Sequence, residues 1–295
     1  MHYTRVKGIL SSKNGINLYR GCTHGCIYCD SRSTCYQMNH DFEDVEVKIN
    51  APELLREKLM SKRKRCMIGM GSMCDPYFPL EEKEMLTHRC LEVIEQCGCG
   101  VTLITKSERV LRDLELLKRI NEKTKCVIQM TLTTYDEQLC KIIEPNVCTT
   151  QRRFEVLKCL SHEGIPTVVW LSPILPFIND TEENLRGILN YCSEAGVRGI
   201  ICFGMGVTLR EGSRDYFYGK LDEYFPGIKE RYIRTYGNMY ECLSQNSKYL
   251  NNILKQECYS NNISCNIEAV SYTHLSEKRY TYFIAIFLLP FFQIL

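Results

Sequence analysis

Short apolar, β-branched runs alternate with longer amphipathic stretches along most of the chain. The runs that we expect to form strands are Ile16–Tyr19, Cys66–Met70, Val101–Thr105, Cys126–Leu132, Thr167–Leu171 and Gly199–Phe203. The helical patterns between them are Pro52–Met60, Glu81–Gln96, Val110–Asn121, Arg153–Glu163 and Glu182–Ala195. This alternation favours right-handed strand–helix–strand units and a parallel sheet. The strands begin about 37 residues apart on average, near the roughly 31 residues of one unit in an eight-fold barrel, so we expect an α/β fold that forms an incomplete barrel.

The chain has 295 residues, a length that allows one or two domains. No linker rich in Gly, Ser or Pro divides residues 1–265, so we expect one domain there, with a C-terminal cap at about 205–265. The tail 266–295 stands apart, because the segment from Val270 to Leu275 reads as one frame of the transposase mosaic-end sequence in library adaptors. We therefore expect the coding sequence to be interrupted near Ala269 and the residues from Val270 onward to be non-native.

The composition restricts the partners and the cellular compartment that we expect for this chain. Lys and Arg number 37 against 35 Asp and Glu, a net charge of +2 that indicates no dedicated polyanionic partner. The 18 cysteines are unusual, but the chain is too long for a disulfide scaffold and its first residues form no apolar signal core. We expect free thiols in a reducing cytoplasm. The apolar stretch Tyr280–Leu295 has 16 residues against the about 20 of a spanning helix, so a tail anchor is borderline. Because we expect this stretch to be non-native, no membrane association is expected.

Three cysteines directly follow the first predicted strand. Cys22, Cys26 and Cys29 have the spacing C-x3-C-x2-C, which places three thiolates on one loop. Such a set can bind three irons of a [4Fe–4S] cluster and leave the fourth iron open, as catalytic metal sites do. A structural zinc ion with His24 or Cys35 as its fourth ligand, or three unligated thiols, are the alternatives.

The cysteine spacing, and the aromatic Tyr28 before the last cysteine, resemble the radical S-adenosylmethionine (SAM) enzymes. Further stretches resemble the spore photoproduct lyase branch of that superfamily: Gly69–Tyr77, Thr105–Ser107, Thr131–Thr134, Glu144-Pro145 with Arg153, Ser172–Pro176 and Asn179-Asp180. The resemblance covers Gly15 to Ile267. It implies a partial (β/α)6 TIM-type barrel of the radical SAM type with a small C-terminal extension, and a cluster at the C-terminal ends of the strands.

The same resemblance implies the chemistry. Cys22, Cys26 and Cys29 would bind a [4Fe–4S] cluster, and the open iron would bind the amino and carboxylate groups of SAM. Reductive cleavage of SAM would give methionine and a 5′-deoxyadenosyl radical that abstracts hydrogen from the substrate, as in a lyase or an oxidoreductase. A flavodoxin or ferredoxin would supply the electron to a monomeric enzyme. Nucleic acid is the first expected substrate, by resemblance alone, and a peptide or small molecule is the second.

Cofactor-binding positions are also implied at the strand ends. Glycine near Gly71 would let the backbone approach the methionine part of SAM closely, and Lys106 would pair with its carboxylate. The residues expected to bind the cofactors, besides the three cysteines, are Tyr28, Gly71, Ser72, Asp75, Lys106, Thr131 and Arg153. For Lys106 and Arg153 an ion pair at the barrel rim is the alternative, with Glu144 as the partner of Arg153.

One position departs from the branch. In spore photoproduct lyase, a cysteine that returns hydrogen to the product radical stands three positions before the aspartate of the second-strand motif. Ser72 occupies this position, and Cys74, next to Asp75, is the remaining candidate for a catalytic hydrogen donor. Its alternative is a packing role, because free cysteine behaves as a small buried apolar residue.

Two further hypotheses remain open at the level of the sequence. Cys242, Cys258 and Cys265 are candidates for an auxiliary cluster, whereas the other scattered cysteines are expected to pack in the core. The alternative from another functional class is a non-catalytic, zinc-stabilised nucleic-acid-binding protein. It would use the basic run Lys62–Arg65 and the C-terminal aromatic residues.

Overall fold

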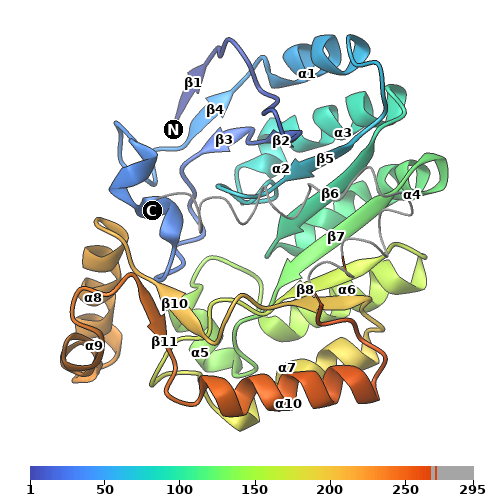
Figure 1. The fold of residues 1–295 in the computed structure, drawn as a ribbon. Coiled ribbons are helices and arrows are strands. Elements are labelled where there is room, and N and C mark those ends of the chain that lie inside the picture. Colours follow the sequence, from blue (N-terminus) through green and yellow to red (C-terminus); the bar gives the residue numbers. More distant parts are fainter. Residues whose placement is uncertain (267–269, 271–295) are drawn as a thin grey trace.

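A six-stranded sheet forms the centre of the molecule in the computed structural model, which describes residues 1–266 and Val270 (Figure 1). Its strands are β2 (Gly15–Ile16), β5 (Met67–Met70), β6 (Gly100–Thr105), β7 (Cys126–Thr131), β8 (Thr167–Trp170) and β9 (Gly199–Ile201). They follow one another in the sheet in chain order, and every neighbouring pair is parallel. The α/β fold with parallel strands expected from the sequence is confirmed.

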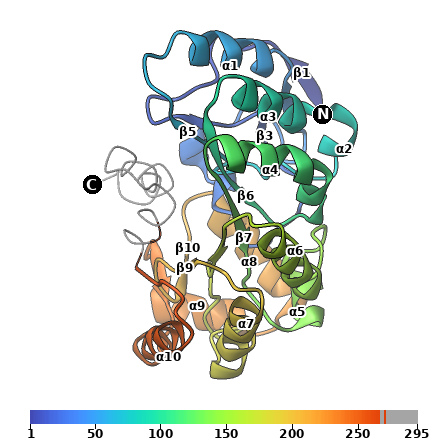
Figure 2. The same cartoon turned by 90° about the vertical axis from the view of Figure 1, so that its right-hand side faces the viewer.

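Helices connect the strands and cover one face of this sheet. They are α1 (Ala51–Met60), α3 (Leu86–Gln96), α4 (Leu114–Lys123), α6 (Thr150–His162) and α7 (Glu182–Glu194). Figure 2 shows them as a column in front of the strands. Within the described part of the chain no pairing joins β2 to β9, so the sheet is a partial barrel and not a closed one. The C-terminal ends of its strands meet at one rim.

The strands are buried because helices cover their outer face and neighbouring side chains fill the inner one. β5 and β7 are buried at every position, as is typical of parallel strands. Leu91 of α3 and Leu117 of α4 are fully buried in the same core as Ile68 and Leu103 of the strands. One continuous apolar core therefore fixes the rim on which the strand ends lie.

The helix expected over Glu81–Gln96 is divided in the structure. A short helix, α2 (Glu81–Glu84), precedes α3, and Met85 between them has a left-handed φ of +53°. The cause is the buried Glu81 carboxylate, which accepts hydrogen bonds from the backbone amides of Leu86 and Thr87 at 3.0 Å. It thereby satisfies the free amides at the start of α3.

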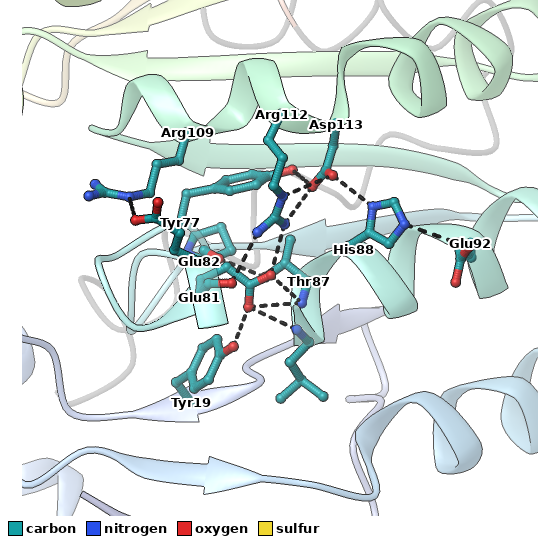
Figure 3. Close-up of polar contacts among 12 residues, drawn as sticks. Tyr19, Tyr77, Glu81, Glu82, Thr87, His88, Glu92, Arg109, Arg112 and Asp113 are labelled. Carbon is teal, nitrogen blue, oxygen red and sulfur yellow. Dashed lines mark hydrogen bonds and ion pairs between the residues drawn. The ribbon is translucent and has the colours of Figure 1, made fainter. Parts of the chain in front are cut away.

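Glu81 belongs to a buried polar network (Figure 3). Its carboxylate accepts hydrogen bonds from the Tyr19 hydroxyl and from Arg112 Nη2. Arg112 also pairs with Asp113, which accepts a further hydrogen bond from the Tyr77 hydroxyl at 2.7 Å. Because Tyr19 lies just before the cysteine loop and Asp113 ends the 3-10 helix η3 (Glu108–Asp113), the network joins these two segments to α2.

The first expected strand, Ile16–Tyr19, is shared between two sheets. Its start lies in β2, whereas β3 (Tyr19–Arg20) joins β1 (His2–Thr4) and β4 (Glu46–Lys48) in a small sheet of order β1-β4-β3. Two short 3-10 helices, η1 (Asp30–Arg32) and η2 (Thr34–Tyr36), and α5 (Glu137–Ile143) were not expected either. All of them are short, so they carry little periodic pattern.

The C-terminal part packs against the barrel through a second core. It comprises β10 (Gly206–Thr208), α8 (Ser213–Tyr224), α9 (Ile228–Tyr236), β11 (Glu241–Leu243) and α10 (Ser247–Ser260). Phe217 and Tyr232 of α8 and α9 pack with Ile27 and Tyr28 of the cysteine loop. The structure thus places α8 and α9 over the loop, while the domain boundaries drawn from the sequence stay predictions.

Residues 267–269 and 271–295 lie outside the residues that the structure describes. The expected interruption near Ala269 and the expected non-native tail fall on this part of the chain. Within residues 1–266, no helix is long and apolar enough to cross a bilayer.

Candidate active site

The three motif cysteines lie on the loop that follows β3, with Cys22 and Cys26 buried and Cys29 half-buried. The turn into this loop requires glycine at position 21. Gly21 has φ +91°, and a Cβ there would come within 2.4 Å of the Phe42 carbonyl oxygen. The same carbonyl accepts a hydrogen bond from the Cys22 amide at 3.0 Å, which fixes the start of the loop.

The middle of the loop is fixed by the last residue of α5 and by the segment that follows it. The Ile27 amide donates to the Ile143 carbonyl oxygen at 3.0 Å, and the Asn146 amide donates to the His24 carbonyl oxygen at 3.2 Å. These bonds connect the cysteine loop to residues more than a hundred positions away in the sequence. The loop is consequently held in place by the fold on both sides.

The spacing of the three thiols fits a cluster better than a single zinc ion. Sulfur ligands of one tetrahedral zinc lie about 3.8 Å apart, because each Zn–S bond is about 2.3 Å. Among the described residues, three donors with all ligand atoms within 4.8 Å of one another occur at His2, His40 and Asp44, and not at the three thiols. Ligands that bind separate irons of a cluster stand further apart, so the donor set fits the iron–sulfur hypothesis.

A neighbouring thiol lowers the pKa of one motif cysteine, whereas burial raises the pKa of the other two. A hydrogen bond from the Cys74 thiol and the proximity of His24 hold the pKa of Cys22 well below its ordinary value, although burial opposes this. Burial raises the pKa of Cys26 and of Cys29. A bound cation supplies the charge that stabilises such buried thiolates, because metal ligation deprotonates cysteine.

A pocket opens beside the cysteine loop and extends over the strand ends. It encloses about 1320 Å³ of space free of atoms, including its open mouth. The expected site residues that line it are Tyr28, Cys29, Gly71, Ser72, Lys106 and Thr131. They come from the loop and from the ends of β5, β6 and β7, so the fold brings together positions that the sequence keeps apart.

Lys106 places a cation on the wall of this pocket. Its Nζ lies 5.8 Å from the centre of the Tyr28 ring, and its ammonium has no hydrogen-bond or ion-pair partner among the described residues. Burial opposes its charge, but the nearby Cys26, Glu144 and Asp75 raise the pKa of Lys106 above its usual value. A charged, partner-free ammonium at a pocket wall is suited to an anionic group such as a carboxylate.

The segment after β5 lies so close to β6 that it excludes a side chain. Gly71 has φ +98°, and a Cβ there would come within 2.2 Å of the Ile104 carbonyl oxygen. The next residue is fixed as well, because the Ser72 hydroxyl donates to Asn17 Oδ1 at 3.0 Å. The backbone of this segment is therefore exposed to the pocket in one defined position.

Arg153 does not line the pocket. It is fully buried and forms an ion pair with Glu144, and its Nη1 donates to the Thr131 carbonyl oxygen at 2.8 Å. Glu144 also accepts a hydrogen bond from the Tyr28 hydroxyl. The structure thus places Arg153 in the ion pair that the sequence left as its alternative role, where it supports Tyr28 and the end of β7.

Cys74 and Asp75 also lie behind the pocket wall. The Cys74 thiol is 7% exposed and contacts Cys22, and neither Cys74 nor Asp75 lines the pocket. Asp75 Oδ1 accepts a hydrogen bond from the Thr105 hydroxyl at 2.7 Å, and Oδ2 lies 3.6 Å from His24 Nδ1. Asp75 therefore connects the cysteine loop to the end of β6.

Two aromatic side chains in the pocket were not expected from the sequence. Trp170 at the end of β8 and Phe203 after β9 line it, with their ring centres 5.2 Å apart. Trp170 Nε1 donates to Gln129 Oε1, and Gln129 Nε2 donates to the Thr102 hydroxyl at 2.6 Å. A usable signal was present, because Trp170 is the only tryptophan and Gln129 is a polar residue inside an apolar strand.

Two of the three candidates for an auxiliary cluster are brought together. The thiols of Cys258 and Cys265 are hydrogen-bonded neighbours near Cys202, whereas Cys242 packs in the second core with α8 and α9. All 18 cysteines are free thiols.

Comparison with known proteins places this site in a family. Residues 16–192 match the family model of the radical SAM superfamily. An uncharacterised protein of Mycobacterium tuberculosis is 28% identical over 227 residues, which cover 75% of this chain and 66% of that protein. One from Methanocaldococcus jannaschii is 33% identical over 181 residues, which cover 61% of this chain and 66% of that protein. The chain thus spans slightly less than two thirds of the length of these relatives.

The solved structures agree on the fold. A mutant of spore photoproduct lyase with bound AdoMet and dinucleoside spore photoproduct matches 83% of this chain and 73% of its own, with a TM-score of 0.60 and 15% identity. At that identity the likeness establishes the shared fold. The family model covers more than half of the chain, including the cysteine loop and the strands β5 to β8 of the main sheet. The chain belongs to the radical SAM superfamily.

Proposed function

We propose that this chain is a radical SAM enzyme in which Cys22, Cys26 and Cys29 bind a [4Fe–4S] cluster beside a pocket for SAM and the substrate. Members of the superfamily bind this cluster and SAM. The observation that carries the proposal is the meeting, at one pocket, of the three-cysteine loop and the partner-free ammonium of Lys106.

Each residue that lines the pocket has its own role in binding SAM. Lys106 binds the carboxylate of SAM, the Gly71–Ser72 backbone lies along its methionine part, and Thr131 offers a hydroxyl at the end of β7. With both cofactors bound, the reduced cluster would supply the electron for cleavage of SAM to methionine and a 5′-deoxyadenosyl radical, which would abstract hydrogen from the substrate. Tyr28, whose hydroxyl donates to Glu144, packs in the second core with Cys26 and Ile27 and keeps the thiols in position.

Nucleic acid is the substrate class that we favour. Trp170 and Phe203 are aromatic side chains that line the pocket, and aromatic side chains are the groups on which bases stack. The spore photoproduct lyase structure that shares this fold binds a dinucleoside photoproduct. The net charge of +2 gives no general attraction to polyanions, so a nucleic acid would be recognised at the pocket and not by a broad basic surface.

The electron donor and the compartment follow from the same chemistry. A flavodoxin or ferredoxin would reduce the enzyme, and the 18 free thiols suit a reducing cytoplasm. The enzyme would act as a lyase or an oxidoreductase, according to the fate of the substrate radical.

The test uses the full chain, purified and reconstituted without oxygen. The parent should hold about four irons per chain and release 5′-deoxyadenosine from SAM in the presence of dithionite. Cys26→Ala should lose both, whereas Cys126→Ala, which removes a buried thiol of β7, should keep both. A colourless protein with stoichiometric zinc and no 5′-deoxyadenosine would overturn the proposal.

Deuterated candidate substrates test the substrate class. Transfer of deuterium from an oligonucleotide into 5′-deoxyadenosine is the expected result, with Trp170→Ala weakening it. Transfer from a peptide in place of the oligonucleotide would contradict the nucleic-acid assignment and leave the radical chemistry intact.

A further inference from the structure

A second group of possible metal ligands lies in the small sheet, outside the pocket. His2 begins β1 and Glu46 begins β4, and the parallel register of these strands pairs the two residues directly. His40 and Asp44 precede β4 on the same side of the molecule. One ligand atom from each of His2, His40 and Asp44 lies within 4.8 Å of the other two.

His40 is the residue that this arrangement leaves unsatisfied. Its Nδ1 lies 3.0 Å from the Asp41 carbonyl oxygen, and a carbonyl only accepts, so Nδ1 carries the proton. The other ring nitrogen, Nε2, is buried and has no hydrogen-bond partner within the described residues. Metal-binding histidines characteristically donate one ring N–H to a carbonyl or carboxylate and point the other nitrogen at the ion.

Carboxylates face both imidazoles. Glu46 Oε2 lies 3.9 Å from His40 Nε2, and Asp44 Oδ2 lies 3.0 Å from His2 Nδ1. Adjacent donors around a tetrahedral zinc ion lie about 3.4 Å apart, since Zn–N and Zn–O bonds are about 2.0–2.2 Å. Both distances are close to this value. Glu46 lies outside the group of three whose ligand atoms are all within 4.8 Å of one another, so its side chain would have to move to complete a set of four.

We propose that His2, His40, Asp44 and Glu46 form a binding site for a divalent transition-metal ion, with zinc as the preferred ion. Two imidazoles and two carboxylates are a donor set that zinc favours, and four protein ligands make a closed, structural site. The amino group of Met1 pairs with Oδ1 of Asp44, which leaves Oδ2 on the side of His2.

The position of the site indicates what the ion would do. The segment from the cysteine loop to β4 contains only the short helices η1 and η2, yet Asp30, Ser31 and Tyr36 of this segment line the pocket. An ion bound by His40 and Asp44 on one side and by β1 and β4 on the other would tether the end of the segment. The zinc site would therefore stabilise one wall of the pocket without taking part in the chemistry.

Metal content distinguishes this site from the cluster. The full chain, reconstituted with iron and sulfide without oxygen and dialysed, should retain about one zinc per chain in addition to its iron. Loss of an outer-sphere partner alone weakens metal binding about 10–100-fold, so loss of an imidazole ligand should weaken zinc binding by at least about tenfold. His2→Ala and His40→Ala should both show this loss with unchanged iron. His162→Ala, whose side chain is 88% exposed, is the matched control and should retain zinc.

Cobalt substitution identifies the donor atoms. Co²⁺ bound at this site should show absorption bands of a nitrogen–oxygen site and no sulfur-to-cobalt charge transfer. Added zinc should raise the thermal midpoint of the parent and of His162→Ala, but not that of His2→Ala, whose side chain is 43% exposed and whose replacement leaves the core intact. Zinc retention unaffected by both histidine variants, or cobalt bands from sulfur, would overturn the proposal. So would the absence of retained zinc in the parent, which would leave His40 and Glu46 as an ion pair only.

Discussion

The Asp75 carboxylate accepts a hydrogen bond from the backbone amide of Lys106 at 2.7 Å. Its other oxygen accepts one from the hydroxyl of Thr105, the last residue of β6. Backbone and hydroxyl donors thus satisfy the carboxylate, and the Lys106 side chain is not required as its partner. This relationship fixes the Lys106 backbone at the rim and leaves its ammonium available to the pocket.

Lys106→Met should weaken SAM binding by about 10–100-fold. The reason is that a hydrogen bond to a charged group contributes about 1.5–3 kcal/mol, and each 1.4 kcal/mol is about tenfold in affinity. Equilibrium dialysis of the reconstituted protein with SAM measures the effect, and iron content should stay at the parental level. Lys123→Met, which removes an exposed lysine paired with Glu95, is the control. Unchanged affinity in Lys106→Met would remove Lys106 from the SAM site.

Gly71→Ala should destabilise the protein more than Gly164→Ala does. Both glycines have positive φ, so both substitutions incur the cost of about 1–2 kcal/mol for a left-handed alanine. Only Gly71 faces a backbone oxygen, at 2.2 Å from the new Cβ, whereas nothing lies within 4 Å at Gly164. Thermal midpoints measured without oxygen compare the two. Equal losses of thermal stability in the two variants would show that a Cβ at position 71 does not clash with the Ile104 carbonyl oxygen.

Cys74→Ala should keep SAM cleavage and deuterium transfer close to the parental rates. The Cys74 thiol contacts Cys22 behind the pocket wall, so its loss removes packing and a hydrogen bond but no group that reaches the substrate. Cys126→Ala, another buried thiol of the main core, is the control for the cost of the smaller side chain. A Cys74→Ala enzyme that keeps its iron and cleaves SAM but no longer completes product formation would instead identify Cys74 as the hydrogen donor.

Asp113→Asn should lower stability at neutral pH by roughly 1.5–3 kcal/mol, because it removes a charged hydrogen-bond acceptor that is fully buried and paired with the partly exposed Arg112. Burial opposes the charge of Asp113, yet hydrogen bonds from Arg112, Tyr77 and His88 hold its pKa below its usual value (Figure 3). A carboxylate with a lowered folded-state pKa contributes stability above its unfolded pKa of about 3.9. That contribution is lost as the pH falls through the folded-state pKa.

The difference between parent and Asp113→Asn should accordingly shrink as the pH is lowered below about 4. Thermal midpoints of both proteins, measured over a pH series, give this difference at each pH. Tyr77→Phe deletes one donor to Asp113 and should reproduce part of the effect. A difference that stays constant down to acidic pH would show that the Asp113 charge does not stabilise the fold.

The centre of the main sheet could be predicted from the sequence, because each strand from β5 to β8 is an apolar run with helices before and after it in the chain. The small sheet could not, since β3 has two residues and β1 and β4 have three, too few to show a period of two. The break between α2 and α3 at Met85 could not be predicted from the sequence either. It arises from the side chain of Glu81, and no local propensity marks a glutamate as a cap for the following helix.

The candidate site was predictable where its residues follow one another or end a predicted strand. The cysteine spacing is local, and Gly71, Lys106 and Thr131 stand at the ends of consecutive strands. The aromatic pair Trp170 and Phe203 depends on the packing of β8 against β9, which sequence patterns do not fix. The histidine and carboxylate group of the small sheet depends on the register of β1 and β4, two strands that were not predicted at all.

The shared core beneath α8 and α9 restricts how such a molecule diverges. Ile27 and Tyr28, which lie between Cys26 and Cys29, pack on Phe217 and Tyr232 of the two helices. Natural drift can alter the outward side of these helices, where Tyr224 is 44% exposed, without disturbing the loop. A substitution on the inward side of these helices must instead be compensated by a substitution in the cysteine loop that packs against them. New specificities in this lineage would therefore arise on the outer surface and pocket edge, while the inner surface evolves in step with the cysteine motif.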